Sequence, residues 1–383
     1  MEYFLTEEQK EIKEMARQVA EEKMKPVREK YDEEAIFPWD IVKVMAQTDL
    51  FRVLLPEEYD GFGGKVMDLV IIMEELSRVD SGIALALGGT GLGIYPILLN
   101  GNEEQKKKYL PQAAAGEKLA AFALTEADAG SDAGGIKTTA KKDGDYYILN
   151  GTKQWITNGG EAEIYTIFAL TDKSKGTRGS SAFILEKGIE GFTFGKKENK
   201  MGIRASCTRE LIFEDVKIPK ENLIGREGMG FMIAMKILDK SRPMVASQAL
   251  GIAQGALDEA VRYSKERHQF GKPISAFQGV QFMLADMAMK LEAARALVYS
   301  TARMIDSGVK KISKESAMCK CYASDVAMEV TTDAVQILGG YGYMKDYPVE
   351  KMMRDAKITQ IYEGTNQIQR IVIASNLLKE YSR

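Results

Sequence analysis

DGDYYILNG, residues 143–151, is the stretch from which the organisation of the chain can be worked out. Asp143-Gly144 and Asn150-Gly151 are dipeptides typical of two-residue hairpin turns, and the residues between them are largely aromatic or β-branched. We therefore predict a strand with a hairpin turn at each end. The strand lies in a region that begins near residue 121, where helical periodicity gives way to strand-like runs.

Further strand-like runs follow on the C-terminal side. They are rich in aromatic and β-branched residues and cover 164–170, 181–185, 192–194 and 210–213. Residues 121–228 are therefore predicted to form a small antiparallel β domain.

Helical patterns flank this region on both sides. Before it, Thr6 and Gln9 make a capping box, and further helices are expected after Phe37-Pro38, around Glu74 and over 103–109. After it, amphipathic stretches cover 231–267, 276–307, 313–338 and 366–381. We expect a mainly α protein with a central β domain. The expected parts are an N-terminal helical domain (1–120), the antiparallel β domain (121–228) and a C-terminal four-helix bundle (229–383).

The composition excludes several classes of function. The 383 residues include 52 basic and 55 acidic side chains, and a net charge of -3 implies neither nucleic-acid nor membrane-surface binding. His268 is the only histidine, so a histidine-rich zinc site is impossible, a Ser-His-Asp triad would need this one residue, and no metal site is expected. The chemistry must therefore rest on carboxylates and a bound cofactor.

The N-terminal segment is charged and amphipathic, without an apolar run followed by a cleavage site. No stretch is expected to reach the ~20 uncharged apolar residues of a membrane span. A cytoplasmic location is the expectation.

A glycine-rich segment, residues 88–93, follows an apolar run and superficially matches a dinucleotide-binding loop. A genuine fingerprint needs a βαβ unit and an acidic residue about 20 positions on. The region near position 108 is instead Lys106-Lys107-Lys108, and no alternating βαβ series follows. A glycine-rich helix that lines a cavity fits the surroundings better.

The first segment with chemical character is ALTEADAGSD, residues 123–132, followed by WITN at 155–158. Gly130-Ser131 can form a tight turn with exposed backbone N–H groups, which suits an anionic or carbonyl ligand. Thr125 and Thr157 carry hydroxyls able to bond the edge of a heterocycle, and Trp155 offers a flat apolar face. An ordinary loop beside a core tryptophan is the alternative interpretation.

The second segment is QILGGYGY, residues 336–343, followed by Asp346, Lys351, Arg354 and Asp355 and then by YEGT at 362–365. Its glycines end a long helix and allow backbone to approach a bulky ligand closely. Glu363 precedes a glycine in a loop between two predicted helices, where its carboxylate can project into a cleft.

Together these segments resemble the acyl-CoA dehydrogenase family, over essentially the whole chain. Residues 123–135 are similar to the family's first signature and residues 336–355 to its second. Residues 242–260 and 267–278 also resemble family sequence, and MRDAKITQIYEGTNQIQR (353–370) is most similar to short-chain, butyryl-type members. Ala127 and Phe122 depart from the family pattern, in which proline and tyrosine are frequent at these positions.

The resemblance implies an FAD cofactor bound between the β domain and the C-terminal bundle. The residues that match flavin-binding positions are Phe122, Leu124, Thr125, Ser131, Trp155, Ile156, Thr157, Arg267, Phe270, Gln278, Gln336, Gly339, Gly340, Thr365, Asn366 and Gln367. Of these, Arg267, Phe270 and Gln278 match positions that reach the flavin of a second subunit, which implies a homotetramer. The residues that match positions around the CoA portion and the thioester are Ser131, Asp239, Arg242 and Gly364.

Glu363 matches the family's catalytic base. By resemblance, it removes the α-proton of an acyl-CoA thioester while a β-hydride passes to FAD, which yields the 2-enoyl-CoA in fatty acid β-oxidation. Hydrogen bonds to the thioester carbonyl stabilise the developing enolate, and burial raises the basicity of the carboxylate. Electrons then pass to an electron-transfer flavoprotein. Some members carry the base near position 241, but Lys240-Ser241-Arg242 offers none there.

Several alternatives stay open within this resemblance. The same active site could run as an enoyl-CoA reductase, or accept branched or cyclic acyl groups. The chain is shorter than a typical acyl-CoA oxidase, and a non-catalytic flavoprotein would not need Glu363, Thr157 and Trp155. The glycines at 88–93 could widen the acyl cavity or only permit close helix packing. No arginine or lysine falls between Ile83 and Gly93, which disfavours a dicarboxylic substrate.

Overall fold

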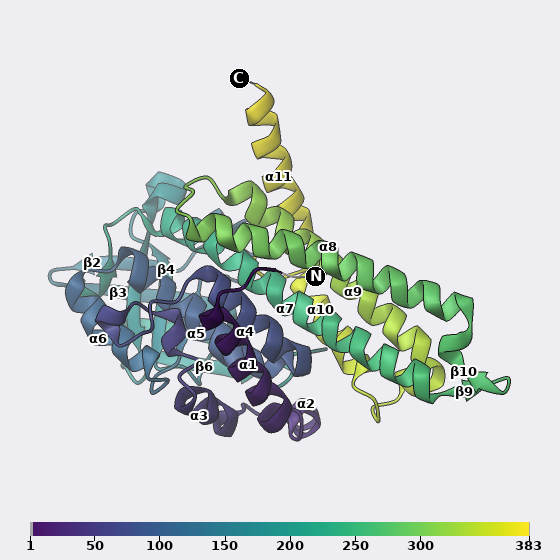
Figure 1. The fold of residues 1–383 in the computed structure, drawn as a ribbon. Coiled ribbons are helices and arrows are strands. Elements are labelled where there is room, and N and C mark those ends of the chain that lie inside the picture. Colours follow the sequence, from purple (N-terminus) through teal and green to yellow (C-terminus); the bar gives the residue numbers. More distant parts are fainter. Residues whose placement is uncertain (1–2, 383) are drawn as a thin grey trace.

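The computed structural model describes residues 3–382, and its elements follow the predicted order of helices, sheet and helices (Figure 1). The N-terminal helices are α1 (Glu7–Gln18), α2 (Arg28–Glu34), α3 (Trp39–Gln47), α4 (Val66–Val79), α5 (Ser81–Asn100) and α6 (Glu103–Ala114). The predicted capping box is present, since the Thr6 hydroxyl accepts the Gln9 backbone N–H and the Gln9 side chain accepts the Thr6 N–H. The N-terminal helices predicted from the sequence are therefore confirmed.

The central part is a twisted sheet in the spatial order β6-β7-β3-β2-β4-β5-β8, with β1 paired to β4. Its strands are β1 (Ala120–Ala123), β2 (Thr139–Asp143), β3 (Tyr146–Thr157), β4 (Ile164–Leu170), β5 (Ser180–Glu186), β6 (Phe192–Lys197), β7 (Thr208–Pro219) and β8 (Leu223–Ile224). The prediction of a purely antiparallel sheet is wrong in one respect. β1 and β2 pair with β4 in parallel, because the β2–β3 hairpin returns the chain before β4 enters.

Of the two hairpin turns predicted in residues 143–151, only the first is present. Asp143 pairs with Tyr146, so Gly144 and Asp145 form a two-residue turn between β2 and β3, and Gly144 has a φ of 61°. Asn150-Gly151 lies inside β3, at a β-bulge against β7. Gly151 has a φ of 139°, and a Cβ there would lie 2.6 Å from Thr138 Oγ1. The glycine therefore serves a bulge and a close backbone approach, and it does not form a turn.

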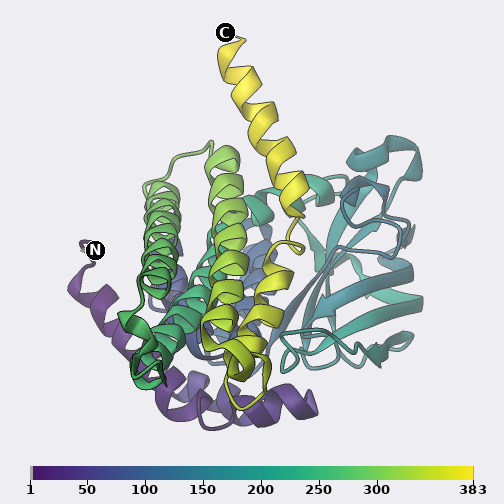
Figure 2. The same ribbon diagram turned by 90° about the vertical axis from the view of Figure 1, so that its right-hand side faces the viewer.

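The C-terminal part begins at Gly230, next to the predicted boundary. Its elements are α7 (Gly230–Glu266), the hairpin of β9 (His268–Gln269) and β10 (Lys272–Pro273), α8 (Gln278–Asp306), α9 (Ser313–Leu338), α10 (Val349–Thr359) and α11 (Asn366–Tyr381). The predicted bundle needs one correction. α10 packs against both α7 and α9. α11 contacts α9, but it projects from the body and buries only Asn366 and Gln369 (Figure 2).

α5 contains all of the glycines between 88 and 93, which confirms the predicted glycine-rich helix. The expectation that no stretch is long and apolar enough to span a membrane is wrong, because α5 meets that test by length and composition. However, 78% of its apolar window is buried inside the protein. α5 is therefore a core helix, apolar on all sides because other elements surround it.

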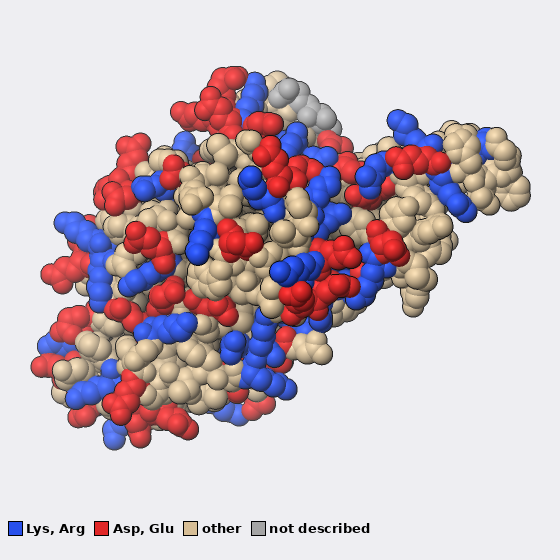
Figure 3. All heavy atoms as spheres, turned by 90° about the horizontal axis from the view of Figure 1, so that it is seen from below, with Lys and Arg blue, Asp and Glu red and all other residues tan. Residues whose placement is uncertain are grey.

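Basic and acidic side chains alternate across the face shown in Figure 3, without a large field of one sign. This pattern is consistent with the near-neutral net charge of -3.

α4 and α7 join two hydrophobic cores. One core lies between the N-terminal helices and the sheet and includes Leu76 of α4 and Ile237 of α7. The other lies among α7, α8, α9 and α10 and includes Val70 of α4. Because both helices bury opposite faces, the three parts of the chain share apolar contacts and cannot move independently at low cost.

We predict opposite effects of alanine at two glycines of α5 that do not line the cleft described below. In Gly93→Ala the new Cβ would lie 2.5 Å from the backbone nitrogen of Ala121, so α5 must move away from β1, at a cost of about 1–3 kcal/mol. Gly91→Ala is the control, because its Cβ would meet only Leu54 at 3.6 Å. It should stabilise the helix by up to about 0.5–1 kcal/mol. Urea denaturation of both variants checks this, and equal stability would contradict the packing of α5 on β1.

Candidate active site

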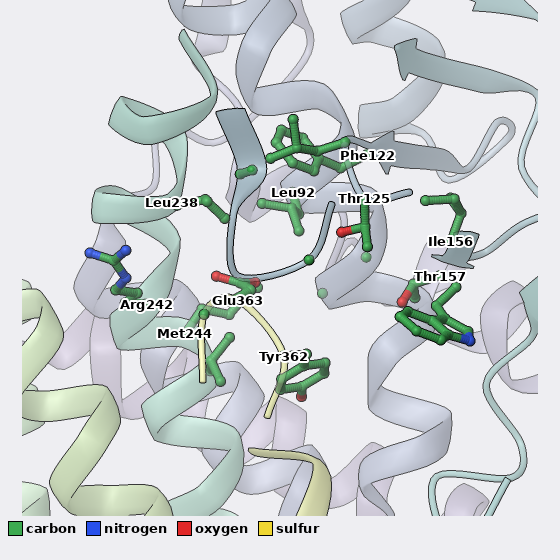
Figure 4. Close-up of a pocket in the computed structure, with 18 of the residues that line it drawn as sticks. Leu92, Phe122, Thr125, Ile156, Thr157, Leu238, Arg242, Met244, Tyr362 and Glu363 are labelled. Carbon is green, nitrogen blue, oxygen red and sulfur yellow. The ribbon is translucent and has the colours of Figure 1, made fainter. Parts of the chain in front are cut away.

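A cleft opens where α5, the sheet, α7 and the α10–α11 loop meet. Figure 4 shows the Glu363 carboxylate in this cleft, with Leu238 and Arg242 of α7 on one side and Thr125 and Thr157 on the other. Ten of the predicted site residues line this cleft, and they are Phe122, Leu124, Thr125, Ser131, Trp155, Ile156, Thr157, Arg242, Glu363 and Gly364.

The segment 124–126 is anchored from behind by a buried lysine. Lys153 of β3 donates to the Leu124 carbonyl at 3.0 Å and to Glu126 Oε1 at 2.7 Å. Glu126 also accepts the backbone N–H groups of Lys137 and Thr138. Burial lowers the pKa of Lys153 to about 8, although the Glu126 carboxylate opposes this shift. These bonds hold the backbone of Leu124 and Thr125 rigidly against the cleft.

A bulge near the end of β3 sets the direction of the residues that follow. The register against β7 shifts between Lys153 and Ile156, and Trp155 adopts a φ of 56° with 57% of its surface exposed. Beyond it, Asn158 is fully buried and donates to the Ala120 carbonyl at 3.1 Å. The bulge turns the indole outward into the cleft, while the buried amide ties the strand end to β1.

The donor set on this side of the cleft fits the flavin of FAD. The hydroxyls of Thr125, Ser131 and Thr157 line the cleft and bond no other described residue. Beside them stands the exposed face of Trp155. A planar heterocycle with polar edges satisfies both features, because its face stacks on the indole and its edge bonds the hydroxyls.

Glu363 projects from the loop between α10 and α11 with left-handed backbone, at a φ of 51°, and Gly364 follows at 92°. Two side chains hold this loop. Lys320 of α9, whose side chain is fully buried, donates to the Gly364 carbonyl at 2.8 Å, and Gln369 of α11 donates to the Glu363 carbonyl at 3.1 Å. The strained conformation persists because these contacts determine it.

The carboxylate of Glu363 experiences opposing influences. Burial in the cleft raises its pKa, whereas a hydrogen bond from Ser241 and the charges of Arg242 and Lys320 lower it, and the net shift is upward. The Ser241 hydroxyl lies 2.5 Å from Glu363 Oε2. A raised pKa makes this carboxylate a stronger base than a solvated glutamate.

Of the predicted CoA and thioester residues, Asp239 does not line the cleft. Its carboxylate accepts Arg242 Nη1 at 2.5 Å and the Ser313 hydroxyl, and it thereby orients the guanidinium. Arg242 does line the cleft, and its buried Nε finds no acceptor among the described residues. An unpaired buried donor at the cleft wall is suited to a polar ligand.

Six predicted flavin-binding residues lie far from this cleft, at the opposite end of the bundle. All six are exposed in the single chain, and they are Arg267, Phe270, Gln278, Gln336, Gly339 and Gly340. Along α7, Arg267 follows Val245 by about 22 residues, which is roughly 33 Å of helix. None of the six lines the cleft of its own chain.

Residues 365–367 also do not line the cleft, although Gly364 and Ile368 on either side of them do. Thr365 caps α11 through the Ile368 N–H, and Gln367 is exposed. The Asn366 side chain turns inward and bonds Lys320, Ser324 and Asp325. Asn366 stabilises the loop that carries Glu363, because Lys320 bonds both the Asn366 side chain and the Gly364 carbonyl.

The predicted cavity-lining helix is confirmed, since Leu85, Gly88, Gly89 and Leu92 of α5 line the cleft. Other lining residues were not predicted from the sequence, and these are Met235, Leu238, Met244, Val245, Gln248 and Ile368. The signal was available in part, because Met235, Leu238, Arg242 and Val245 recur at the spacing of one helical face. Tyr362 donates to Gln248, which donates to Ser81 at 2.5 Å, so a buried polar chain closes one side.

The structure favours close packing over cavity widening as the reason for the glycines of α5. A Cβ on Gly88 would lie 3.0 Å from Met73 Cε and 3.6 Å from Met244 Sδ. On Gly89 it would lie 2.9 Å from Thr157. The space beside both glycines is therefore already filled by side chains.

The chain matches three family models in succession. These are the N-terminal domain of acyl-CoA dehydrogenase over residues 6–117, its middle domain over 121–216 and its C-terminal domain over 228–378. The structure of butyryl-CoA dehydrogenase from Megasphaera elsdenii is 50% identical, with a TM-score of 0.96 and coverage of 99% of this chain and 100% of that one.

Two further proteins are similarly close. A chain in a structure of the electron transferring flavoprotein of Acidaminococcus fermentans is 55% identical, with a TM-score of 0.97 and coverage of 99% and 100%. Acryloyl-CoA reductase (NADH) of Anaerotignum propionicum is 51% identical over 99% of this chain and 96% of its own length. Three family models match in succession, and these relatives share about 50% sequence identity with the chain over nearly its whole length. The chain belongs to the acyl-CoA dehydrogenase family of FAD-dependent oxidoreductases.

Proposed function

We propose that this acyl-CoA dehydrogenase oxidises short, unbranched acyl-CoA thioesters to 2-enoyl-CoA, with Glu363 as the catalytic base. The observation that carries the proposal is that Glu363 is the one carboxylate among the described residues that line the cleft. It faces the three free hydroxyls and the exposed indole that suit a flavin.

In this proposal the two walls of the cleft divide the work. Glu363 takes the α-proton, and its raised pKa brings its proton affinity closer to what the reaction needs. When bound, FAD supplies the acceptor for the β-hydride. Arg242 and the polar groups around it orient the thioester, and the apolar residues of α5 and α7 exclude water from the acyl chain.

A short acyl group is supported by the methionines beside Gly88. Met73 and Met244 fill the space beside Gly88, where we propose that a longer acyl chain would have to lie. The Megasphaera elsdenii relative is a butyryl-CoA dehydrogenase. Branched and cyclic acyl groups would have to displace these side chains, so we propose that they are poorer substrates than short, unbranched ones.

The proposed electron acceptor is an electron-transfer flavoprotein. This partner is supported by the similarity to a chain in a structure of such a protein. The proposed location is the cytoplasm, where three buried free thiols persist without disulfides.

Enoyl-CoA reduction is the second candidate function, favoured by the similarity to an acryloyl-CoA reductase. The same atoms would run in reverse, with Glu363 delivering the α-proton. Comparison of butyryl-CoA oxidation with crotonyl-CoA reduction, in the presence of the flavoprotein partner, distinguishes the physiological direction.

We also propose a homotetramer in which Arg267, Phe270 and Gln278 reach the FAD of a neighbouring subunit. The exposure of these three side chains in one chain supports this. The apolar surface of α11 supports it too, since Ile371 and Leu378 are 59% and 68% exposed. An apolar helix that projects from the body is stabilised when a second copy covers it.

Glu363→Gln should retain the fold and FAD but lose activity by several orders of magnitude, because the nearly isosteric amide cannot accept the α-proton. The measurement is anaerobic bleaching of the flavin absorption by butyryl-CoA. Glu190→Gln, at an exposed glutamate of the β domain, is the control. If Glu363→Gln kept a tenth of the wild-type rate, another group would be the base.

Phe270→Ala should lower the flavin content of the purified protein, because this side chain, 92% exposed in one chain, is proposed to cover the FAD of another subunit. The ratio of flavin to protein absorbance measures the effect, and light scattering should give a wild-type mass near four times 42.5 kDa. Phe62→Ala, at a phenylalanine that is 56% exposed elsewhere, is the control. A monomer with full flavin occupancy would refute the arrangement.

Met244→Ala should shift preference toward longer chains, because it removes the side chain whose sulfur lies beside Gly88. The ratio of kcat/KM for hexanoyl-CoA to that for butyryl-CoA should rise several-fold, on the order of the burial of one or two methylenes. Met201→Ala, at an exposed methionine, should leave the ratio unchanged. An unchanged ratio in Met244→Ala would show that the acyl chain ends elsewhere.

A further inference from the structure

Ser241 is a buried residue of α7 whose hydroxyl points at the proposed base. Its Oγ lies 2.5 Å from Glu363 Oε2 and 3.3 Å from the carbonyl oxygen of Leu238, one helical turn earlier. The hydroxyl has one proton and can donate to only one of these acceptors at a time. The other carboxylate oxygen of Glu363, Oε1, has no hydrogen-bond partner within residues 3–382.

We propose that Ser241 is a positioning residue that holds the ionised carboxylate of Glu363 against α7 and turns its free oxygen toward the cleft. This inference rests on the proposed role of Glu363 as the base. In this proposal Ser241 determines which carboxylate oxygen receives the α-proton. The hydroxyl binds Oε2, so Oε1 accepts the proton.

The second acceptor makes this tether easy to release. When Glu363 takes up a proton, its carboxyl group no longer attracts the hydroxyl as a charged acceptor does. Ser241 can then donate to the Leu238 carbonyl, so no buried donor is left unsatisfied. The tether is therefore strong for the ionised base and weak for the protonated acid.

Other groups also act on Glu363, and their effects must be separated from that of Ser241. Arg242 of α7 and Lys320 of α9 face it with positive charge and lower its pKa. Tyr95 of α5 and the adjacent Tyr362 face it as neutral phenols whose own pKa values are raised. Ser241 is the neutral group in direct hydrogen-bond contact, so its removal changes no net charge.

The sign of the effect follows from the direction of the hydrogen bond. Ser241 donates to the ionised form and stabilises it, which lowers the pKa of Glu363. Loss of the hydroxyl should therefore raise this pKa. The acid limb of kcat/KM against pH, which reports the free enzyme, should move to higher pH.

The test compares the FAD-loaded wild type with three variants, using butyryl-CoA as substrate. In Ser241→Ala the acid limb should move up by about one pH unit, the scale of a charge-assisted hydrogen bond. Ser241→Thr keeps a hydroxyl and should restore the wild-type limb. Ser247→Ala is the matched control, because this buried serine of the same helix donates to the Met244 carbonyl at 2.8 Å and, among residues 3–382, to no other group.

A direct readout of the carboxyl group makes the test independent of turnover. The infrared band of protonated Glu363, identified by its loss in Glu363→Gln, should titrate at higher pH in Ser241→Ala than in the wild type. An unmoved limb and band in Ser241→Ala, or an equal shift in Ser247→Ala, would overturn the proposal. If Ser241→Ala does not fold, Ser241→Cys replaces it, since a thiol is a weaker donor of similar size. Activity retained by Glu363→Gln would instead refute the base itself.

Discussion

The three parts of the chain are held in place relative to one another by a buried ion-pair cluster, in which the ammonium group of Lys351 lies between two carboxylates. This group lies 2.5 Å from Asp355 on its own helix, α10, and 2.9 Å from Asp80 at the start of α5. Asp355 also accepts the backbone N–H of Ile203 from the β domain, at 2.5 Å. Burial alone would lower the pKa of Lys351, but the two carboxylates outweigh it and raise the pKa. Loss of one partner of a buried ion pair leaves an uncompensated buried charge, which costs about 3–5 kcal/mol. The cluster therefore fixes the positions of the bundle, the sheet and the N-terminal helices relative to one another.

This cluster reaches the active site through the elements that it joins. Asp80 caps α5 by accepting the Ile83 N–H at 2.9 Å, and α5 forms one wall of the cleft. α10 ends four residues before Glu363, so its position decides where the base enters the cleft. Two further buried lysines, in the walls of the cleft, also fix the backbone by hydrogen bonds. Lys153 holds the carbonyl of Leu124, and Lys320 that of Gly364, and burial lowers the pKa of each lysine to about 8. The bonds of Lys153 fix the backbone of Leu124 and Thr125 at the cleft, and that of Lys320 keeps the left-handed backbone at Glu363 and Gly364 in place.

Much of this protein could be read from local patterns in the chain. Periodicity and capping predicted the helices, and the strand-like runs at 164–170 and 192–194 lie in β4 and β6, because these signals are properties of neighbouring residues. Family signatures identified Glu363 and the segments 122–131 and 155–157, which line one cleft. Asn150-Gly151 misled because a hairpin dipeptide and a bulge need the same backbone freedom. The apolar length of α5 was overlooked, and length and composition alone do not distinguish such a core helix from a membrane span.

The sequence by itself determined the order of the elements, the family and the residue that carries the carboxylate. Only the tertiary structure decided what surrounds that carboxylate. Ser241 and Lys320 are 122 and 43 residues from Glu363 along the chain, and no local pattern relates them. Likewise, the expectation that α11 completes the bundle followed from its length and amphipathic pattern, but α11 contacts α9 and leaves Ile371 and Leu378 exposed. The physical reason is the same in each case. Hydrogen bonding within an element depends on nearby residues, whereas burial and electrostatics depend on which distant elements pack together.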